Sequence, residues 1–375
     1  MSSFAARDYR RLVVKVGSSL LIDADGALNR RWLDGLAADV AGWQQGGLEL
    51  LVVSSGAIAL GSGVLGINVR RSRLVDLQAA AAAGQVQLAH AWSEALGRHG
   101  VRAAQVLLTP DDTESRRRFL NARGTLSRLL EHKVVPVINE NDTVATEEIR
   151  YGDNDRLAAR VAQLVMADGL ILLSDVDGFY SADPGRHPAA EHFAEVTSIS
   201  EEMQRMAGET RSDIGSGGMA TKVQAARIAT HAGCSTIIAS GTVLRPLRAL
   251  QDGARHTKFI ASASPAAARK QWLAGALNVE GMLTIDDGAA AALRAGKSLL
   301  PVGVTGVAGT FERGAVVTLC DPGGEEIGRG LAEYGSEDAA KLIGCRSERI
   351  EELLGFRGRP VMIHRDEMVV FDGHE

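Results

Sequence analysis

Up to residue 261, short apolar segments alternate with longer segments of helical periodicity. Apolar strands separated by amphipathic helices are typical of a parallel sheet covered by helices on both faces. The sequence therefore predicts an α/β fold with an open, mostly parallel sheet. The predicted strands are Leu12–Val16, Leu48–Val53, Val134–Ile138, Leu170–Leu173 and Thr236–Ala239, and the predicted helices include Arg31–Gln45, Val75–Leu96, Asp155–Met166 and Met219–Ala232.

Near residue 262 this alternation stops, and a stretch rich in alanine, serine, proline and basic residues follows. Beyond it, short apolar runs with closely spaced glycines indicate a small β-rich domain. We therefore predict a first domain over residues 1–261, a linker over 262–279 and a tail domain over 280–375. The apolar runs of the tail are Leu283–Ile285, Val302–Val304, Val316–Leu319 and Val361–Ile363.

Most predicted strands of the first domain end in small or polar residues. In an open α/β sheet the ligand crevice lies at the carboxyl ends of the strands, so these residues are expected to converge there. Lys15 lies at the same edge, and a lysine between two valines is unusual in a strand buried on both faces. The alternative is an exposed lysine at a strand end. The polar clusters are Gly17-Ser18-Ser19, Ser54-Ser55-Gly56, Asn139-Glu140-Asn141-Asp142 and Ser174-Asp175.

A glycine-rich run over residues 215–222 leads directly into the predicted helix that begins at Met219. Glycines let the backbone approach an anion closely, the helix N-terminus offers unpaired N–H groups, and Lys222 adds a full positive charge. The run is therefore a candidate phosphate-binding loop, although its order differs from the Walker pattern Gly-x-x-x-x-Gly-Lys-Ser/Thr. The alternative is a flexible surface loop before an ordinary helix.

Composition adds few constraints. Of the 375 residues 45% are hydrophobic and the formal net charge is −5, which argues weakly against a nucleic-acid partner but not against a nucleotide. No apolar stretch approaches the roughly 18 uninterrupted residues of a membrane helix, and the N-terminal segment lacks the apolar core of a secretion signal. The three cysteines lack metal or redox spacing. We therefore expect a cytoplasmic protein without a membrane partner.

Five motifs, in this order and approximate spacing, resemble those of the bacterial glutamate 5-kinases, a branch of the amino acid kinase family. The tail resembles a PUA domain, so the resemblance covers essentially the whole chain. The motifs are Lys15-Val16-Gly17-Ser18-Ser19, Ser54-Ser55-Gly56-Ala57, Asn139-Glu140-Asn141-Asp142, Gly152-Asp153-Asn154-Asp155 and Gly217-Gly218-Met219-Ala220-Thr221-Lys222, and the tail positions are Ser298–Gly303, Gly306, Phe311, Gly314 and Tyr334.

The resemblance implies phosphoryl transfer from ATP, carried with Mg²⁺, to the γ-carboxylate of L-glutamate, the first step towards proline. A carboxylate nucleophile is already ionised at neutral pH and needs no general base, so the main task is to neutralise charge and position the reactants. Lys15 and Lys222 are the expected catalytic cations, and Asp155 is expected to hold both. The alternative for Asp155 is an acid at a helix start, stabilised by the helix dipole.

The same resemblance implies which residues bind the substrate and which bind the nucleotide. The expected substrate-binding residues are Ser55, Asn139, Asp142 and Asn154, because glutamate presents an ammonium and two carboxylates. Magnesium is expected on the ATP phosphates, since no cluster looks like a metal site made by protein ligands alone. Ser174-Asp175 match a Thr-Asp pair that lies by the nucleotide in relatives. The expected nucleotide-binding residues are Lys15, Ser174, Asp175, Ser216, Gly217, Gly218, Met219, Ala220, Thr221 and Lys222.

Relatives further imply a homo-oligomer, feedback inhibition by proline and hand-over of the product to glutamate-5-semialdehyde dehydrogenase. The polar stretch Thr109–Asn121 is a candidate lid over the glutamate site, because it follows an apolar run and lies between two of the motifs.

Three alternative functions stay open. Sister kinases of the same fold act on acetylglutamate, aspartate, carbamate or UMP. The charge of the tail argues against RNA binding, because residues 280–375 hold 10 Lys and Arg against 17 Asp and Glu, a difference of −7. A dinucleotide-dependent oxidoreductase would need Gly-x-Gly-x-x-Gly after the first strand, which Lys15–Leu20 does not supply.

Overall fold

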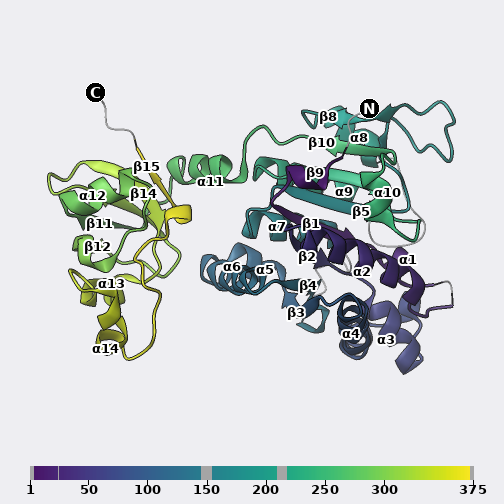
Figure 1. Ribbon diagram of the computed structural model, residues 1–375, viewed down its shortest axis with the longest axis horizontal. Coiled ribbons are helices and arrows are strands. Elements are labelled where there is room, and N and C mark those ends of the chain that lie inside the picture. Colours follow the sequence, from purple (N-terminus) through teal and green to yellow (C-terminus); the bar gives the residue numbers. More distant parts are fainter. Residues whose placement is uncertain (1–3, 24, 145–153, 209–217, 372–375) are drawn as a thin grey trace. The chain divides into compact units, whose positions relative to one another are not determined.

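The computed structural model describes residues 4–23, 25–144, 154–208 and 218–371. The chain divides into two compact units. The first comprises Met1–Glu114 and Ala122–Pro265, and the second comprises Ser115–Asn121 and Ala266–Glu375. Each unit has a central sheet of its own (Figure 1).

In the described part of the first unit, eight strands form one sheet in the order β3-β4-β2-β1-β5-β9-β10-β8. Neighbouring strands are parallel except β9 and β10, which are antiparallel. The predicted open, mostly parallel sheet is therefore confirmed. The strands are β1 (Arg11–Val16), β2 (Glu49–Val53), β3 (Arg102–Leu108), β4 (Val134–Glu140), β5 (Gly169–Ser174), β8 (Glu195–Val196), β9 (Ser235–Ser240) and β10 (His256–Phe259), and a separate hairpin pairs β6 (Phe179–Tyr180) with β7 (His192–Phe193).

Helices cover both faces of this sheet (Figure 1). Helices α2, α4 and α10 contribute to the apolar cluster on one face, and α7 and α9 pack on strands β1, β5 and β9. Helix α3 packs on α4, and α8 packs on α9. The bounds are α1 (Ser18–Leu21), α2 (Arg30–Gln45), α3 (Ala57–Leu65), α4 (Leu74–Gly97), α5 (Pro110–Glu114), α6 (Arg116–Glu131), α7 (Asn154–Leu164), α8 (Glu201–Gly208), α9 (Met219–His231) and α10 (Pro246–Gln251).

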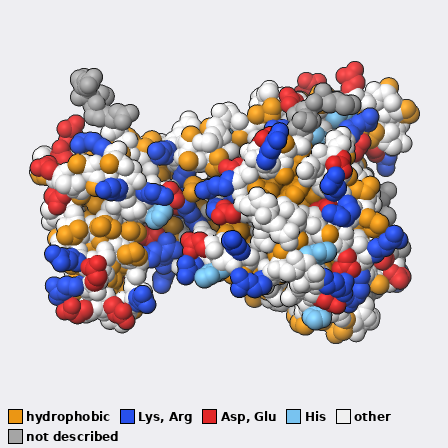
Figure 2. All heavy atoms as spheres, in the orientation of Figure 1, with side chains coloured by type: hydrophobic (Ala, Val, Ile, Leu, Met, Phe, Trp, Pro, Cys, Tyr) orange, Lys and Arg blue, Asp and Glu red, His pale blue; other side chains and the backbone are white. Residues whose placement is uncertain are grey.

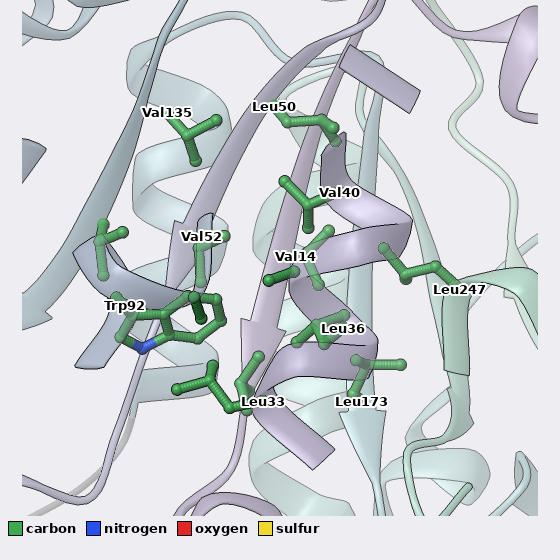
Figure 3. Close-up of a cluster of buried hydrophobic side chains, with 14 of the residues drawn as sticks. Val14, Leu33, Leu36, Val40, Leu50, Val52, Trp92, Val135, Leu173 and Leu247 are labelled. Carbon is green, nitrogen blue, oxygen red and sulfur yellow. The ribbon is translucent and has the colours of Figure 1, made fainter. Parts of the chain in front are cut away.

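The alternation of side chains along β1 explains where Lys15 points. Successive side chains of a strand lie on opposite faces, and Leu12, Val14 and Val16 all belong to the large apolar cluster. Lys15 therefore lies on the other face with Val13, the face on which α7 packs. Figure 3 shows part of the apolar cluster, with Val14, Leu33, Leu36, Val40, Leu50, Val52, Trp92, Val135, Leu173 and Leu247 labelled.

The second unit is a small mixed domain. Its five-stranded sheet has the order β12-β11-β13-β14-β15, in which β11 and β13 are parallel and the other neighbours antiparallel. Buried side chains such as Phe311 and Tyr334 form its core. The elements are β11 (Gly281–Ile285), β12 (Val304–Gly309), β13 (Val316–Cys320), β14 (Glu326–Leu331), β15 (Met368–Val370), α11 (Pro265–Ala274), α12 (Asp287–Arg294), α13 (Ser336–Lys341) and α14 (Ile350–Leu354).

Three of the predicted segments have defined local structure. The proposed linker 262–279 contains helix α11, and Leu273 of that helix is fully buried. In the apolar run Val361–Ile363, the β pairing is confined to an isolated antiparallel bridge between Ile363 and Leu299. The candidate lid Thr109–Asn121 is helical, forming α5 and the start of α6. Asp112 accepts hydrogen bonds from the backbone N–H and the hydroxyl of Thr109. These two hydrogen bonds cap the N-terminus of α5.

The surface is charged and mixed. Figure 2 shows Lys and Arg side chains interspersed with Asp and Glu over the visible face of both units, in keeping with the small net charge. Within the described residues, none of the helices has both the length and the apolar character needed to cross a bilayer.

Candidate active site

A buried cluster of two lysines and one aspartate lies at the carboxyl edge of the first sheet. Asp155 Oδ1 is 2.6 Å from Lys15 Nζ, and Asp155 Oδ2 is 3.2 Å from Lys222 Nζ. Lys15 and Lys222 are each 6% exposed and Asp155 is 1% exposed. The structure thus brings together three residues that are far apart in the sequence and that we predicted as catalytic.

Local structure explains how the three side chains meet. Lys15 points from β1 towards α7, and Asp155 is the second residue of that helix. Lys222 is the fourth residue of α9, which packs against α7. The hydroxyl of Thr221 lies 2.9 Å from Asp155 Oδ2 and 2.8 Å from the carbonyl oxygen of Gly218. Thr221, predicted as a nucleotide-binding residue, therefore also contacts the central carboxylate.

The electrostatics of this cluster keep the carboxylate ionised. Burial by itself raises the pKa of Asp155, but the ammonium groups of Lys15 and Lys222 outweigh that effect. The pKa of Asp155 consequently lies well below its usual range. The cluster carries a net charge of about +1 and offers two cations held in fixed positions, which suits an anionic ligand.

A second cluster is built from amide and hydroxyl groups at the ends of β2 and β4. Asn154 Nδ2 lies 2.7 Å from Ser55 Oγ, 3.0 Å from the carbonyl oxygen of Ser54 and 3.1 Å from Asn139 Oδ1. Ser55, Asn139 and Asn154 are all buried. Because Asn154 and Asp155 are neighbours at the start of α7, the amide cluster and the lysine cluster are adjacent. Three of the four predicted substrate-binding residues therefore lie together.

Asp142, the fourth predicted substrate residue, follows β4 in a short 3₁₀ helix, η3 (Asp142–Val144), that packs against α4. Loss of solvation on burial raises the pKa of this carboxyl from 3.8 to about 6. A desolvated carboxylate gains more from a cationic partner than an exposed one does, so Asp142 is suited to receive an ammonium group.

Two further residues, Gln85 and Trp92, belong to the site although our sequence reasoning did not select them. Both come from α4 and are buried. Asn139 Nδ2 donates to Gln85 Oε1 at 2.9 Å, and Trp92 Nε1 donates to Ser54 Oγ at 2.9 Å. Their spacing of seven residues puts both side chains on the same face of α4. A side chain with a polar group on an otherwise apolar helix face is the sequence signal that could have identified these two residues.

The predicted nucleotide side of the site is described in part. Ser174 ends β5, next to β1, and its hydroxyl donates to Asp175 Oδ1 at 2.9 Å. Gly218 precedes α9, and Met219 and Ala220 form the first turn of that helix. Ser216 and Gly217 lie outside the described residues. Within the described residues, no group of three or more His, Cys, Asp or Glu side chains is arranged to hold a metal ion.

Comparison with known proteins gives consistent matches. The model of the amino acid kinase family matches residues 10–240, and that of the PUA domain matches residues 281–354. Glutamate 5-kinase 1 of Mesorhizobium japonicum is 54% identical over 364 residues, covering 97% of this chain and 96% of that protein. Glutamate 5-kinase of Rhodopseudomonas palustris is 55% identical over 371 residues, covering 99% of both chains. Among solved structures, carbamate kinase from Giardia lamblia bound to AMP-PNP has a TM-score of 0.49 at 15% identity, covering 67% of this chain and 98% of that one.

Proposed function

This chain belongs to the amino acid kinase family, and we propose that it transfers the γ-phosphoryl group of ATP to the γ-carboxylate of L-glutamate. The products are ADP and γ-glutamyl phosphate, the first intermediate towards proline. The observation that carries this proposal is the buried arrangement of Lys15, Asp155 and Lys222 directly beside a cluster of amide groups. The names of the relatives supply the choice of glutamate within the family.

The mechanism we propose depends on charge neutralisation. One oxygen of the γ-carboxylate attacks the γ-phosphorus, and the bond from this phosphorus to the oxygen bridging it to the β-phosphate breaks as ADP leaves. Both reactants are anionic, so Lys15 and Lys222 would reduce their repulsion and stabilise the charge of the transferring group. Asp155 would keep the two ammonium groups at a fixed separation, and no residue needs to remove a proton from the nucleophile.

The substrate residues would recognise the amino-acid end of glutamate. Asp142 would pair with the α-ammonium, and Asn154 and Asn139 would bind the same end through their amides. Ser55 precedes α3, whose first backbone N–H groups form a suitable site for a carboxylate. Gly56 there has a φ of 103°, a left-handed conformation that favours glycine, and so it turns the chain from β2 into α3.

The nucleotide would lie on the side of Lys15 and Lys222 that faces away from the substrate residues. We assign it to Ser174, Asp175 and the run from Ser216 to Lys222, with Lys15 reaching the phosphates. Mg²⁺ would be bound mainly by the ATP phosphates and would supply additional charge neutralisation. As ATP is the phosphoryl donor, we place the reaction in the cytoplasm.

A substrate panel tests the function directly. ADP release is measured with ATP and Mg²⁺ and with glutamate, acetylglutamate, aspartate, carbamate or UMP as acceptor, and the acyl phosphate product is trapped as its hydroxamate. We expect glutamate to give the highest kcat/KM by a wide margin. A higher value for any other acceptor would assign the chain to a sister activity.

Asp142→Asn is expected to raise KM for glutamate on the order of 10- to 100-fold, because a charge-assisted hydrogen bond is lost, while KM for ATP stays nearly unchanged. The pKa of about 6 adds a pH dependence. Below pH 6 the wild-type carboxyl is protonated and cannot pair with the ammonium, so kcat/KM for glutamate falls as the pH is lowered. The variant has no carboxyl to titrate and should lack this acidic limb between pH 5 and 8. Equal rises in both KM values would indicate a structural role instead.

Proline is our proposed feedback inhibitor, because it carries the same α-amino and α-carboxylate groups as glutamate. We expect competitive kinetics, with the apparent inhibition constant rising linearly with glutamate concentration, and weaker inhibition in Asp142→Asn. Initial rates over a matrix of glutamate and proline concentrations measure this. Inhibition that is independent of glutamate concentration and unchanged in Asp142→Asn would place the proline site elsewhere.

Two assembly proposals accompany this function. An acyl phosphate is prone to hydrolysis, which favours hand-over of the product to glutamate-5-semialdehyde dehydrogenase. By analogy with relatives, the enzyme is proposed to act as a homo-oligomer.

A further inference from the structure

Three side-chain amides form a continuous buried row behind the substrate site. Gln85, Asn139 and Asn154 are 9%, 2% and 4% exposed. Asn139 Nδ2 donates to Gln85 Oε1 at 2.9 Å, and Asn154 Nδ2 donates to Asn139 Oδ1 at 3.1 Å. Asn139 and Asn154 each donate to the oxygen of the amide before them, so the row has a defined direction.

The Ser54 end of the row fixes this direction. At one end, the carbonyl oxygen of Ser54 can only accept, so Asn154 must present its NH₂ group there. Asn139 must then present its oxygen to Asn154 and its own NH₂ group to Gln85. An acceptor is therefore required at position 85, and without one the buried Asn139 NH₂ group loses its partner, which favours rotation of that amide.

The direction of the row determines which atom of Asn154 remains available. The two hydrogens of its NH₂ group are shared among acceptors on Ser54, Ser55 and Asn139, whereas its Oδ1 is buried and has no hydrogen-bond partner among the described residues. Buried acceptors are normally satisfied, so an unsatisfied one calls for a further partner such as a ligand or an ordered water. Asn154 Oδ1 is therefore suited to accept a hydrogen bond from a donor on the ligand, such as an ammonium group.

Helix α4 holds Gln85 in a fixed position relative to the site. The backbones of α3 and α4 are in direct contact: a Cβ atom on Gly84 would lie 1.8 Å from the carbonyl oxygen of Ala57, and one on Gly61 would lie 1.7 Å from that of Ala80. Trp92, on the same face of α4, holds Ser54 by its indole N–H. Gln85 is thus fixed against both strand ends that supply the substrate residues.

We propose that Gln85 is a positioning residue for the α-ammonium group of the substrate. It holds Asn139 with its oxygen towards Asn154, and this hydrogen bond adds to those of Ser54 and Ser55 in keeping Asn154 Oδ1 free for the substrate. Gln85 itself does not contact the substrate in this proposal, and it acts through its hydrogen bond to Asn139. This inference rests on the proposed function, since it takes glutamate as the ligand that supplies the ammonium.

Gln85→Met provides the test, because methionine has nearly the same length and volume but lacks the acceptor. We expect KM for glutamate to rise on the order of tenfold, with kcat and KM for ATP changing less than about twofold. Gln85→Glu retains an acceptor and should restore KM to within about threefold of wild type. Gln87→Met, at an exposed position of the same helix, is the matched control and should leave KM unchanged. Should Gln85→Met prove insoluble, Gln85→Asn, whose amide is too short to reach Asn139, replaces it.

A double-mutant cycle distinguishes positioning from a general loss of structure. If Gln85 acts through Asn139, adding Gln85→Met to Asn139→Ala should not raise KM for glutamate beyond that of Asn139→Ala alone. Fully additive effects, or a loss of kcat with unchanged KM for glutamate, would overturn the inference. The wild-type substrate panel keeps the two proposals separate: a wild type that does not use glutamate rejects the function, whereas an active wild type with an unaffected Gln85→Met variant rejects the positioning role alone.

Discussion

Replacing either Lys15 or Lys222 with alanine is expected to lower kcat for glutamate phosphorylation on the order of 10²-fold or more, which is the size of effect seen when one group stabilising transition-state charge is removed. Both ammonium groups lie within 3.2 Å of the same buried carboxylate and have little solvent around them. Water therefore cannot replace the lost charge at low cost. Steady-state kinetics with saturating ATP and glutamate measure the effect.

Folding should change much less than activity in these two variants. Each variant leaves Asp155 with one lysine and with the hydroxyl of Thr221. Lys297→Ala, at an exposed position of the second unit, is the control and should keep wild-type kcat. A near-normal kcat in either active-site variant would show that its lysine has no role in the chemistry.

The predicted strands of the central sheet agree with the structure to within one or two residues at most ends, because strands buried on both faces are continuous apolar runs. The missed strands have a different character. The residues of β3 are mostly partly exposed at a sheet edge, and β10 is a four-residue strand with a polar sequence, His256–Phe259, that pairs antiparallel to β9. Neither has the apolar continuity that a sequence pattern detects.

The residues of the candidate site that belong to sequence motifs could be predicted from the sequence. Lys15, Asp155 and Lys222 lie in motifs with recognisable spacing, and the structure brings their side chains together. Gln85 and Trp92 lie within a regular helix. Their hydrogen bonds join α4 to residues 54 and 38 positions away along the chain, which no local pattern encodes. The helical character of Thr109–Asn121 did have a local signal, since Thr109 and Asp112 have the spacing of a helix N-cap.

The second large effect is expected for Asp155→Asn, in which the two lysines lose the group that fixes their positions. We expect kcat to fall on the order of 10²-fold, with a smaller change in KM for glutamate, because an asparagine cannot pair with two ammonium groups at once. A change confined to KM for glutamate would contradict the orienting role. Asp39→Asn is the matched control, since Asp39 is a buried aspartate of α2 that binds Arg245 and the backbone N–H groups at the start of α10. It should reduce stability while leaving kcat of the folded enzyme unchanged.

Asp155→Asn should also destabilise the first unit in a pH-dependent way. Removing one partner of a buried ion pair leaves an uncompensated charge and costs about 3–5 kcal/mol, and here two ammonium groups lose their counter-charge. The pKa of Asp155 is lowered in the folded protein from a reference value of 3.8, so its contribution to stability is complete above that value and is lost as the pH falls through the folded pKa. The difference in Tm between wild type and variant should therefore be largest above about pH 4 and shrink progressively as the pH falls below that value. Differential scanning calorimetry from pH 3 to 8 measures this, and a difference in Tm that persists undiminished at pH 3 would show that the loss comes from packing and not from the charge of Asp155.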